Sequence, residues 1–308
     1  MRVSVVIPAW NERNRLRRLL TTLAHTVVDP ADRMDVVVVD DGSTDGTGDT
    51  IAAPAKCVRL TRSGRAAARN AGIAEATGEL IVLLDADQLV GPAFIAAHIH
   101  AHRQRDDLVV IGPRHELADG PIDEDRLARG FTLDAVPPVA RGDDRELLLA
   151  ELSADLNELA IRWHLMFSCN VSVRTEHLRA VGGFDEAFTG WGLEDCELGY
   201  RMHQRGMTFA WNPAATTYHQ QAQHIDADKY AQFTRNLTYM IGKHRTPEVA
   251  LQELIGRALD PAGHATSWLE AARRFEIEAR ALRRLSPPTT GRSAAATGTH
   301  ATTTGCPH

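Results

Sequence analysis

Residues 36–43, Val36-Val37-Val38-Val39-Asp40-Asp41-Gly42-Ser43, place four consecutive β-branched residues before two acids, a glycine and a serine. An unbroken apolar run is typical of a strand that is covered on both faces, as in a parallel sheet. The glycine permits a tight turn, and the serine can cap a helix that follows. This stretch therefore predicts a buried strand that ends in an acidic turn before a helix.

The same succession of apolar runs and polar turns extends through residues 1–112. Helix-like stretches separate the apolar runs, and strands that alternate with helices at this spacing form βαβ units. We therefore predict an α/β fold with a mostly parallel, Rossmann-like central sheet flanked by helices. The expected strands are 3–7, 35–39, 57–60, 80–84 and 108–111, and the expected helices are 13–25, 47–53, 65–76 and 92–105.

Composition and charge exclude several classes of protein. The chain has 308 residues, 44% of them apolar, and a net charge of −6, which argues against disorder throughout and against a nucleic-acid partner. No apolar run approaches the roughly 18 residues of a membrane span, and no signal peptide precedes the first strand. The four cysteines form no CxxC pair, so neither a zinc site nor a disulfide framework is expected. A cytoplasmic, reducing compartment is the predicted location.

Three of the predicted strands end in acids. The first runs into Pro8-Ala9-Trp10-Asn11-Glu12, the second into Asp40-Asp41 and the fourth into Asp85-Ala86-Asp87. Open α/β sheets bind ligands at the carboxyl ends of their strands. Two acids in a D-x-D pattern after a buried strand can contribute to a site for a hard cation that bridges phosphates. The alternative is a solvated turn with two helix-capping acids.

Two further features allow both a structural and a functional interpretation. Asp40-Asp41-Gly42 can be a tight turn, or it can supply a carboxylate that accepts hydrogen bonds from a base or a ribose. Arg65 and Arg69 lie four residues apart, on one face of a predicted helix. They can bind an anionic substrate or be ordinary surface arginines.

The combination of these motifs resembles a known family. Taken in order along residues 1–112, they are similar to the nucleotide-sugar half of family 2 glycosyltransferases of the GT-A fold. The motifs are Val5-Val6-Ile7-Pro8-Ala9-Trp10-Asn11-Glu12, Val39-Asp40-Asp41-Gly42-Ser43-Thr44-Asp45-Gly46-Thr47, Ala68-Arg69-Asn70-Ala71-Gly72 and Leu83-Leu84-Asp85-Ala86-Asp87.

A second group of motifs follows in residues 168–219. These motifs resemble the acceptor side of polypeptide N-acetylgalactosaminyltransferases and β-1,4-galactosyltransferases. They are Gly182-Gly183-Phe184-Asp185-Glu186 and Thr189-Gly190-Trp191-Gly192-Leu193-Glu194-Asp195-Cys196-Glu197. The resemblance ends at about residue 220.

The resemblance implies roles for residues on the donor side. The nucleoside pocket would be lined by Pro8, Ala9, Glu12 and Asp41. Asp85, with its neighbour Ala86, would lie near the ribose and the metal, and Asp87 would ligate the metal. His219, at the end of a predicted strand, matches a third metal ligand, although a histidine there is otherwise often a surface residue. Arg65 or Arg69 would help to hold the nucleotide or its diphosphate. The implied cofactor is Mn²⁺ or Mg²⁺.

On the acceptor side, Glu194 and Asp195 begin a predicted helix. Acids favour the positive end of the helix dipole, so simple capping is one interpretation. The resemblance favours Asp195 as a general base and Glu194 as a residue that binds acceptor hydroxyls. Trp191 would offer an apolar plate to a sugar, unless it packs in the core, and Gly192 would let the loop close over the donor. Asn170 resembles a residue near the acceptor side of the pocket.

These observations predict a metal-dependent glycosyltransferase of the hexosyltransferase type. The expected donor is a nucleoside diphosphate sugar, a UDP-sugar first, and the simpler mechanism is a single displacement with inversion. The resemblance to the polypeptide transferases, which retain configuration, keeps retention open as well. The acceptor stays open among a saccharide, a peptide, a lipid carrier and a small molecule. The alternatives are a nucleotidyltransferase on a sugar phosphate, which usually has a glycine-rich basic loop after its first strand, and a non-catalytic transferase-like binding subunit.

The predicted organisation has three parts. A catalytic domain covers residues 1–220, with a nucleotide-sugar half at 1–112 and an acceptor half at 113–220. The acceptor half is expected to contain a long loop at 113–145 and a helix at 144–164. A helical extension covers 221–286, and a disordered tail covers 287–308. The arginine-rich helix at 268–285 is expected to pack one face on the catalytic domain; the alternatives are docking of a partner, a membrane surface or an anionic carrier.

Overall fold

The computed structural model describes residues 1–152, 154–221, 224–263 and 266–285. Its centre is a seven-stranded sheet with the order β10-β6-β9-β4-β1-β2-β3. Only β9 runs antiparallel to its neighbours, which confirms the prediction of a mostly parallel sheet. The strands are β1 (Arg2–Ala9), β2 (Arg33–Asp41), β3 (Lys56–Leu60), β4 (Leu80–Leu84), β6 (Leu108–Ile111), β9 (Asn170–Arg174) and β10 (Thr208–Trp211).

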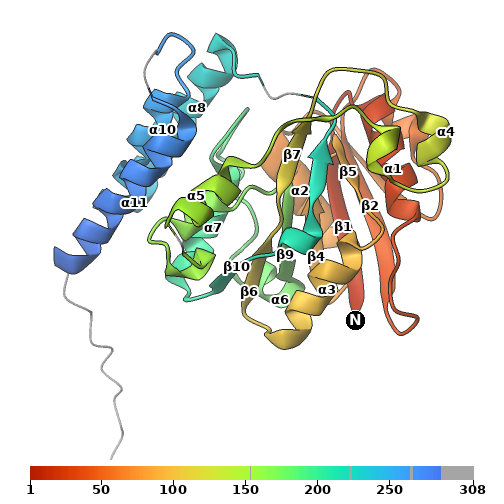
Figure 1. Cartoon of the computed structure of the whole chain (residues 1–308), viewed down its shortest axis with the longest axis horizontal. Helices are drawn as coiled ribbons and strands as arrows, with labels where there is room; N and C mark the ends of the chain where they lie inside the picture. Colours follow the sequence, from red (N-terminus) through yellow and green to blue (C-terminus); the bar gives the residue numbers. More distant parts are fainter. Residues whose placement is uncertain (153, 222–223, 264–265, 286–308) are drawn as a thin grey trace, which may run out of the picture.

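Helices cover both faces of this sheet (Figure 1). Alternate residues of β1 point to opposite sides, so Val5 packs with α1 (Arg13–Ala24) and α3 (Phe94–Gln104). Val6 belongs instead to the larger apolar cluster that includes residues of α2 (Arg65–Glu75), α6 (Thr175–Ala180) and α7 (Glu194–Gln204). Burial on both faces explains why the strand sequences are continuously apolar.

A second, four-stranded sheet has the order β5-β11-β7-β8. It lies beside the carboxyl edge of the main sheet (Figure 1). The antiparallel pairing of β11 with β5 sets His219 opposite Gln88, next to Asp87. Its strands are β5 (Gln88–Val90), β7 (Arg114–Leu117), β8 (Val139–Arg141) and β11 (Thr217–His219).

Three of the predicted elements were wrong. The expected loop at 113–145 contains β7, α4 (Glu124–Leu127), the short 3₁₀ turn η2 (Leu133–Ala135) and β8. The expected helix at 144–164 is α5 (Asp144–Leu152) followed by the 3₁₀ turns η3 (Leu156–Glu158) and η4 (Arg162–Leu165), because the Asp155 carboxylate accepts from the Asn157 N–H and begins a new turn. The expected helix at 47–53 is only the 3₁₀ turn η1 (Thr47–Thr50), since Pro54 disfavours helical backbone at the residue before it.

The C-terminal helices pack against the acceptor half. Phe233, Ile255 and Phe275 belong to the same apolar cluster as residues of the central sheet. The carboxylate of Glu276, 1% exposed, accepts the backbone N–H groups of Ala160 and Ile161 at 3.1 and 3.0 Å, and so fastens α11 to the turn before η4. Figure 1 shows α8, α10 and α11 together at one end of the molecule. These helices are α8 (Ala227–His244), α9 (Pro247–Ala250), α10 (Gln252–Ala258) and α11 (Trp268–Leu285).

No helix within the described residues is long and apolar enough to cross a membrane. The predicted disordered tail at 287–308 lies outside the described residues. The division of the chain at residues 112 and 220 stays a prediction.

Candidate active site

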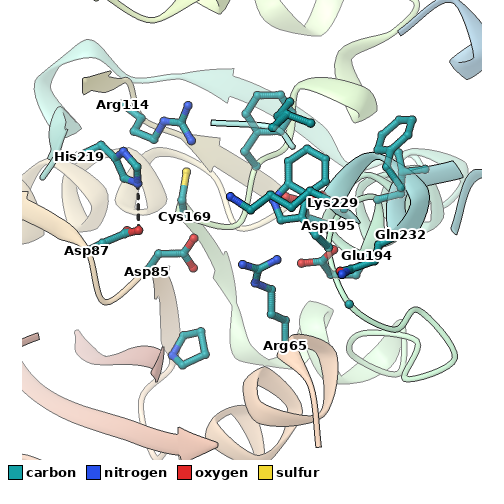
Figure 2. Close-up of a pocket in the computed structure, with 18 of the residues that line it drawn as sticks. Arg65, Asp85, Asp87, Arg114, Cys169, Glu194, Asp195, His219, Lys229 and Gln232 are labelled. Carbon is teal, nitrogen blue, oxygen red and sulfur yellow. Dashed lines mark hydrogen bonds and ion pairs between the residues drawn. The ribbon is translucent and has the colours of Figure 1, made fainter. Parts of the chain in front are cut away.

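A cavity of about 1010 Å³ opens at the carboxyl ends of β1, β2 and β4. Its opposite wall comes from the loop before α7 and from α8, α10 and α11. Of the predicted site residues, all except Asn170 line this cavity. Figure 2 shows the donor-side acids and the acceptor-side acids facing one another across it, with Arg65 between them.

Asp85, Asp87 and His219 meet on one side of the cavity (Figure 2). The Oδ2 atom of Asp87 lies 2.9 Å from Nε2 of His219. Burial would raise the pKa of Asp87, but the charge of His219 and its hydrogen bonds lower that pKa to about 2. The Asp85 side chain is 33% exposed and therefore accessible to a ligand.

Carboxylate oxygens and one imidazole suit a divalent cation such as Mn²⁺ or Mg²⁺. The described residues contain no group of three or more histidines, cysteines or acids close enough together to hold a metal ion by themselves. A cation held by Asp85, Asp87 and His219 would therefore need further ligands, such as substrate phosphates and water. This is the usual arrangement when a cation bridges phosphates.

The predicted nucleoside wall is formed by the ends of β1 and β2. Pro8, Ala9, Glu12 and Asp41 all line the cavity. The buried Asp41 carboxylate accepts the backbone N–H groups of Ser63 and Gly64 at 2.6 and 2.9 Å, so it holds the loop after β3 in place. Burial raises the pKa of Glu12, and the nearby charges of Asp87 and Asp85 raise it further against the effect of Arg15.

Arg65 and Arg69 occupy very different surroundings, although they share one helix face. Arg65 is exposed at the cavity, and no described residue pairs with its guanidinium. Arg69 is 3% exposed, and its two terminal nitrogens donate to Asp85 and Glu194, each at 2.9 Å. Arg65 is therefore the better placed of the two to meet a phosphate.

The loop before α7 has an unusual backbone that aims the acceptor-side residues. Gly190, Gly192 and Leu193 have φ of 78°, 96° and 74°, in the left-handed region that favours glycine. A Cβ on Gly192 would lie 3.0 Å from the ring of Phe233. One side-chain amide, that of Asn236 on α8, donates to the carbonyl oxygens of Thr189 and Gly192 at 3.2 and 2.8 Å. This loop presents the half-buried Trp191 and the start of α7 to the cavity.

Asp195 has the properties expected of a general base. Burial, and then the charge of Glu194, raise the pKa of Asp195 to about 6, against the opposing effect of Arg69. Its two oxygens accept backbone N–H groups, from Cys196 at 2.8 Å and from Ser168 at 3.3 Å, which fix the direction of the carboxylate. A carboxyl group with this pKa is mostly ionised at pH 7 and still basic enough to take a proton.

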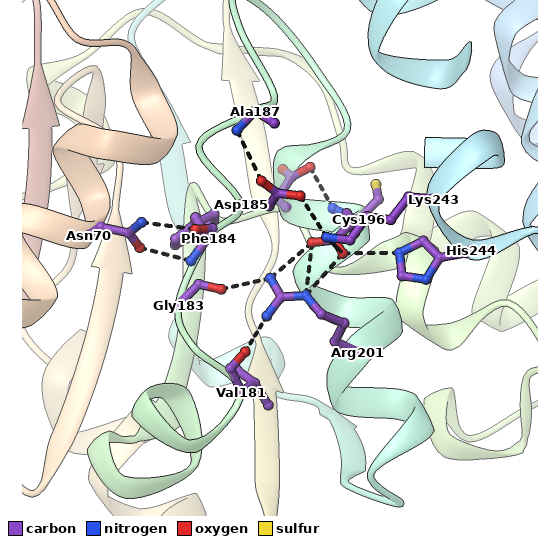
Figure 3. A network of polar contacts seen from close by, with 12 residues as sticks. Asn70, Val181, Gly183, Phe184, Asp185, Ala187, Cys196, Arg201, Lys243 and His244 are labelled. Carbon is purple, nitrogen blue, oxygen red and sulfur yellow. Dashed lines mark hydrogen bonds and ion pairs between the residues drawn. The ribbon is translucent and has the colours of Figure 1, made fainter. Parts of the chain in front are cut away.

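A buried ionic network holds α7 in place. Glu197, which is fully buried, accepts from Arg201, Lys243 and His244 (Figure 3). Burial would raise the pKa of Glu197, but these hydrogen bonds lower it to about 2. The network ties the first turn of α7, which also carries Glu194 and Asp195, to the end of α8.

Asn170 does not lie at the cavity. Its side chain is fully buried and donates to the carbonyl oxygens of Pro113 and Ala215 at 3.0 and 2.7 Å. Asn170 therefore joins the chain segments that lead into β7 and β11. The resemblance placed it near the acceptor side of the pocket, but Asn170 is the first residue of β9 and its side chain is buried away from the cavity.

Sequence reasoning missed several residues that line the cavity. Arg62 lies 4.0 Å from the ring centroid of Trp10, at the mouth of the nucleoside wall. Lys229 and Gln232 on α8 and Trp268 on α11 come from helices that carry no recognisable motif. No pattern in the sequence could have placed these three, because only the packing of the C-terminal helices brings them to the site.

Comparisons with known proteins identify the class and the family. A parallel sheet whose acidic strand ends face a large cavity is the arrangement of the GT-A glycosyltransferases, and solved structures of that class share the fold. GalNAc-T7, solved with UDP, GalNAc and Mn²⁺, has a TM-score of 0.57 and 18% identity, covering 91% of this chain and 54% of that one. S. aureus TarS 1–349, solved with UDP-GlcNAc, has a TM-score of 0.54 and 16% identity, covering 83% and 72% of the two chains.

Residues 4–142 match the model of glycosyl transferase family 2, and residues 151–225 match the N-terminal domain of galactosyltransferase. The chain belongs to the family 2 glycosyltransferases, with a galactosyltransferase-like second half, as the sequence motifs predicted. Validoxylamine A glucosyltransferase of Streptomyces hygroscopicus subsp. limoneus is 35% identical over 232 residues, 67% of this chain and 48% of that protein. Hyaluronan synthase of Pasteurella multocida is 28% identical over 235 residues, 70% of this chain and 24% of that protein. The chain thus spans less than half the length of these two relatives.

Proposed function

We propose that this protein transfers a sugar from a nucleoside diphosphate sugar to a hydroxyl group of an acceptor, with a divalent cation at Asp85, Asp87 and His219. One observation carries the proposal: the cation-binding acids and a carboxylate with a raised pKa, Asp195, face one another across one cavity. The donor side is proposed to take UDP. In this proposal Pro8, Ala9, Glu12 and Asp41 line the nucleoside pocket, and the small side chain of Ala86 leaves room for the ribose.

The charges of the site fit this donor. The diphosphate brings negative charge next to Asp85, Asp87 and Glu12, so it needs cations. Arg65 supplies one, because its exposed guanidinium is free to donate two parallel N–H···O bonds to a phosphate group. The bound metal ion would neutralise the leaving diphosphate and act as a Lewis acid.

The proposed chemical step is a single displacement at the anomeric carbon. The acceptor oxygen forms a bond to that carbon while its proton passes to Asp195. The bond from the anomeric carbon to the β-phosphate oxygen breaks, and the nucleoside diphosphate leaves with the electron pair. Attack from the side opposite the leaving group inverts the configuration. Glu194 orients the start of α7, and Trp191 packs against a face of the sugar or the acceptor.

A donor panel tests the proposal. We expect UDP to bind in the presence of Mn²⁺, with binding measured by calorimetry, and at least one nucleotide sugar to be hydrolysed or transferred. UDP-glucose is the first donor to test, because the 35% identical relative is a glucosyltransferase. Chelation of the metal should abolish turnover. A protein that binds no UDP or GDP and turns over no donor in the panel would contradict the proposal.

The acceptor and the location stay predictions. The acceptor is a saccharide, a peptide, a lipid carrier or a small molecule, and a product analysis by NMR spectroscopy would report both its identity and the anomeric configuration. A cytoplasmic protein, with or without peripheral attachment to a membrane through α11, is the predicted setting. Flotation with liposomes tests the attachment.

A further inference from the structure

Arg69 is the one buried side chain that contacts both the donor-side and the acceptor-side acids among the described residues. Its Nη2 donates to Oδ1 of Asp85 and its Nη1 donates to Oε1 of Glu194, both at 2.9 Å. Asp85 follows β4 in the nucleotide-sugar half, whereas Glu194 begins α7 in the acceptor half. The two pairs therefore join the two halves of the site through one guanidinium.

The surroundings of Arg69 make this bridge rigid. The next residue, Asn70, forms a reciprocal pair of hydrogen bonds with the backbone of Phe184, at 2.9 and 2.8 Å (Figure 3). The guanidinium carbon of Arg69 also lies 5.3 Å from the centroid of the Phe184 ring. Arg69 is thus held against the Gly-Gly-Phe-Asp segment from one side and between two carboxylates from the other.

The charge of Arg69 acts on the acids of both halves. The charges of Asp85, Glu194 and Asp195 all act on the buried guanidinium, and two of these acids pair with it directly. Burying a carboxylate without a cationic partner is costly. Glu194 is 5% exposed, and Arg69 is the only cation among the described residues with a recorded ion pair to it. Arg69 therefore fixes the direction of the Glu194 carboxylate.

We propose that Arg69 is a positioning residue, not a phosphate ligand, and that it couples the donor carboxylate Asp85 to the start of the catalytic helix through Glu194. The inference rests on the proposed function. It reassigns Glu194 as well, since an oxygen of this buried carboxylate is held by Arg69 rather than presented to acceptor hydroxyls. Asp195, one residue further along, is then the acid that remains to act as the base.

Matched substitutions of the two arginines test this assignment. Arg69→Met should leave the Kd of UDP, measured by calorimetry at saturating Mn²⁺, within about 3-fold of the wild-type value. It should lower kcat for donor hydrolysis or transfer by about 100-fold, the size expected when a catalytic group is displaced by about 1 Å. Arg65→Met should do the opposite and raise the Kd of UDP by about 10-fold or more, because it removes a charge-assisted bond to phosphate. Arg274→Met, at an exposed pair on α11, is the control and should change neither quantity.

A second variant covers the case in which Arg69→Met fails to fold. Arg69→Lys keeps the charge but has one nitrogen in place of a planar fork, so it cannot hold both carboxylates in the same geometry. We expect it to fold, to bind UDP normally and to lose about 10-fold in kcat, intermediate between the wild type and Arg69→Met. A role in folding alone would lower stability in Arg69→Met and leave kcat per folded molecule unchanged.

The outcomes separate the inference from the proposed function. A rise in the Kd of UDP in Arg69→Lys or Arg69→Met as large as that in Arg65→Met would overturn the inference, because Arg69 would then be a phosphate ligand. An unchanged kcat in both Arg69 variants would overturn it as well. If the wild-type protein itself binds no UDP and hydrolyses no nucleotide sugar, it is the proposed function that fails.

Discussion

Replacing Asp195 with asparagine tests the assignment of the general base most directly. The change keeps the size of the side chain, and the remaining amide oxygen can still accept the N–H group of Cys196, so α7 should begin at the same place. Besides the ability to take a proton, the variant loses the long hydrogen bond that Oδ2 accepts from the Ser168 N–H group at 3.3 Å. General base catalysis contributes about 10² to 10⁴ in rate, so kcat should fall by at least about 100-fold while the Kd of UDP stays unchanged.

The pH dependence of the rate gives a second, independent test of Asp195 as the base. Burial and the charge of Glu194 raise the pKa of Asp195 to about 6, against the pull of Arg69 and the more distant Arg145. Ionisation at this pKa is about 90% complete at pH 7 and about 10% complete at pH 5. The rate with the wild-type protein should therefore fall by roughly 10-fold between these values, and the variant should lack this limb of the profile.

The free energy of unfolding should fall as the pH rises, whereas the rate should increase. A folded-state pKa above the unfolded value means that this carboxyl group stabilises the folded state below about pH 4, and that the contribution is lost as the pH rises to about 6. A shift of roughly two pKa units corresponds to at most about 3 kcal/mol. Asp195→Asn removes the charge, so its free energy of unfolding at pH 7.5 should exceed that of the wild type by up to about that amount.

The assay combines initial rates from pH 5 to 8 with urea unfolding at pH 7.5. Glu278→Gln, on the exposed side of α11, is the control and should match the wild type in both. A variant that retains more than about a tenth of the wild-type rate at pH 7.5 would refute the assignment, because general base catalysis contributes at least about 100-fold. So would an unchanged acidic limb in Asp195→Asn.

Three further predictions concern the metal, the loop and the C-terminal helices. Asp87→Asn or His219→Ala should weaken Mn²⁺ binding in the presence of UDP by about 10-fold or more, measured by calorimetry, and excess Mn²⁺ should partly restore the rate. Asn236→Ala removes the amide that holds the loop of Trp191. It should therefore raise the KM for the acceptor (or the KM of donor hydrolysis, where no acceptor is known) more than it changes the Kd of UDP. An equal change in the two constants would contradict the role given to this amide. Glu276→Ala leaves two buried N–H groups without an acceptor and should lower the free energy of unfolding by about 2 to 4 kcal/mol in urea, whereas Glu276→Gln should cost less.

The donor side of the site could be predicted from the sequence because its residues follow strands directly. Asp41, Asp85 and Asp87 come at the ends of apolar runs, and parallel strands bring such ends to one edge. The pattern could not separate Arg65 from Arg69. Both lie on one helix face, and only the approach of α7 buries Arg69 and leaves Arg65 exposed.

Local motifs also failed where a residue serves the packing of two distant segments. Asn170 was placed near the acceptor by resemblance, yet it begins the buried strand β9 and its amide joins the backbone near Pro113 to that near Ala215. The loop expected at 113–145 contains strands because β7 pairs with β11, about a hundred residues further along the chain. Pairing over such a distance leaves no periodic pattern in the short strands themselves.

The sequence by itself determined the mostly parallel sheet, the family and the acidic edge at which the donor is proposed to bind, because alternating strands and helices and the turns that follow them are local features. The tertiary structure alone decided which charged groups at that edge pair with one another. It paired Asp87 with His219, set Arg69 between Asp85 and Glu194, and left Asp195 with a raised pKa. It also brought Lys229, Gln232 and Trp268 to the cavity. Burial and distance govern both the pKa values and the walls of the cavity, and both arise only when segments far apart in the chain pack together.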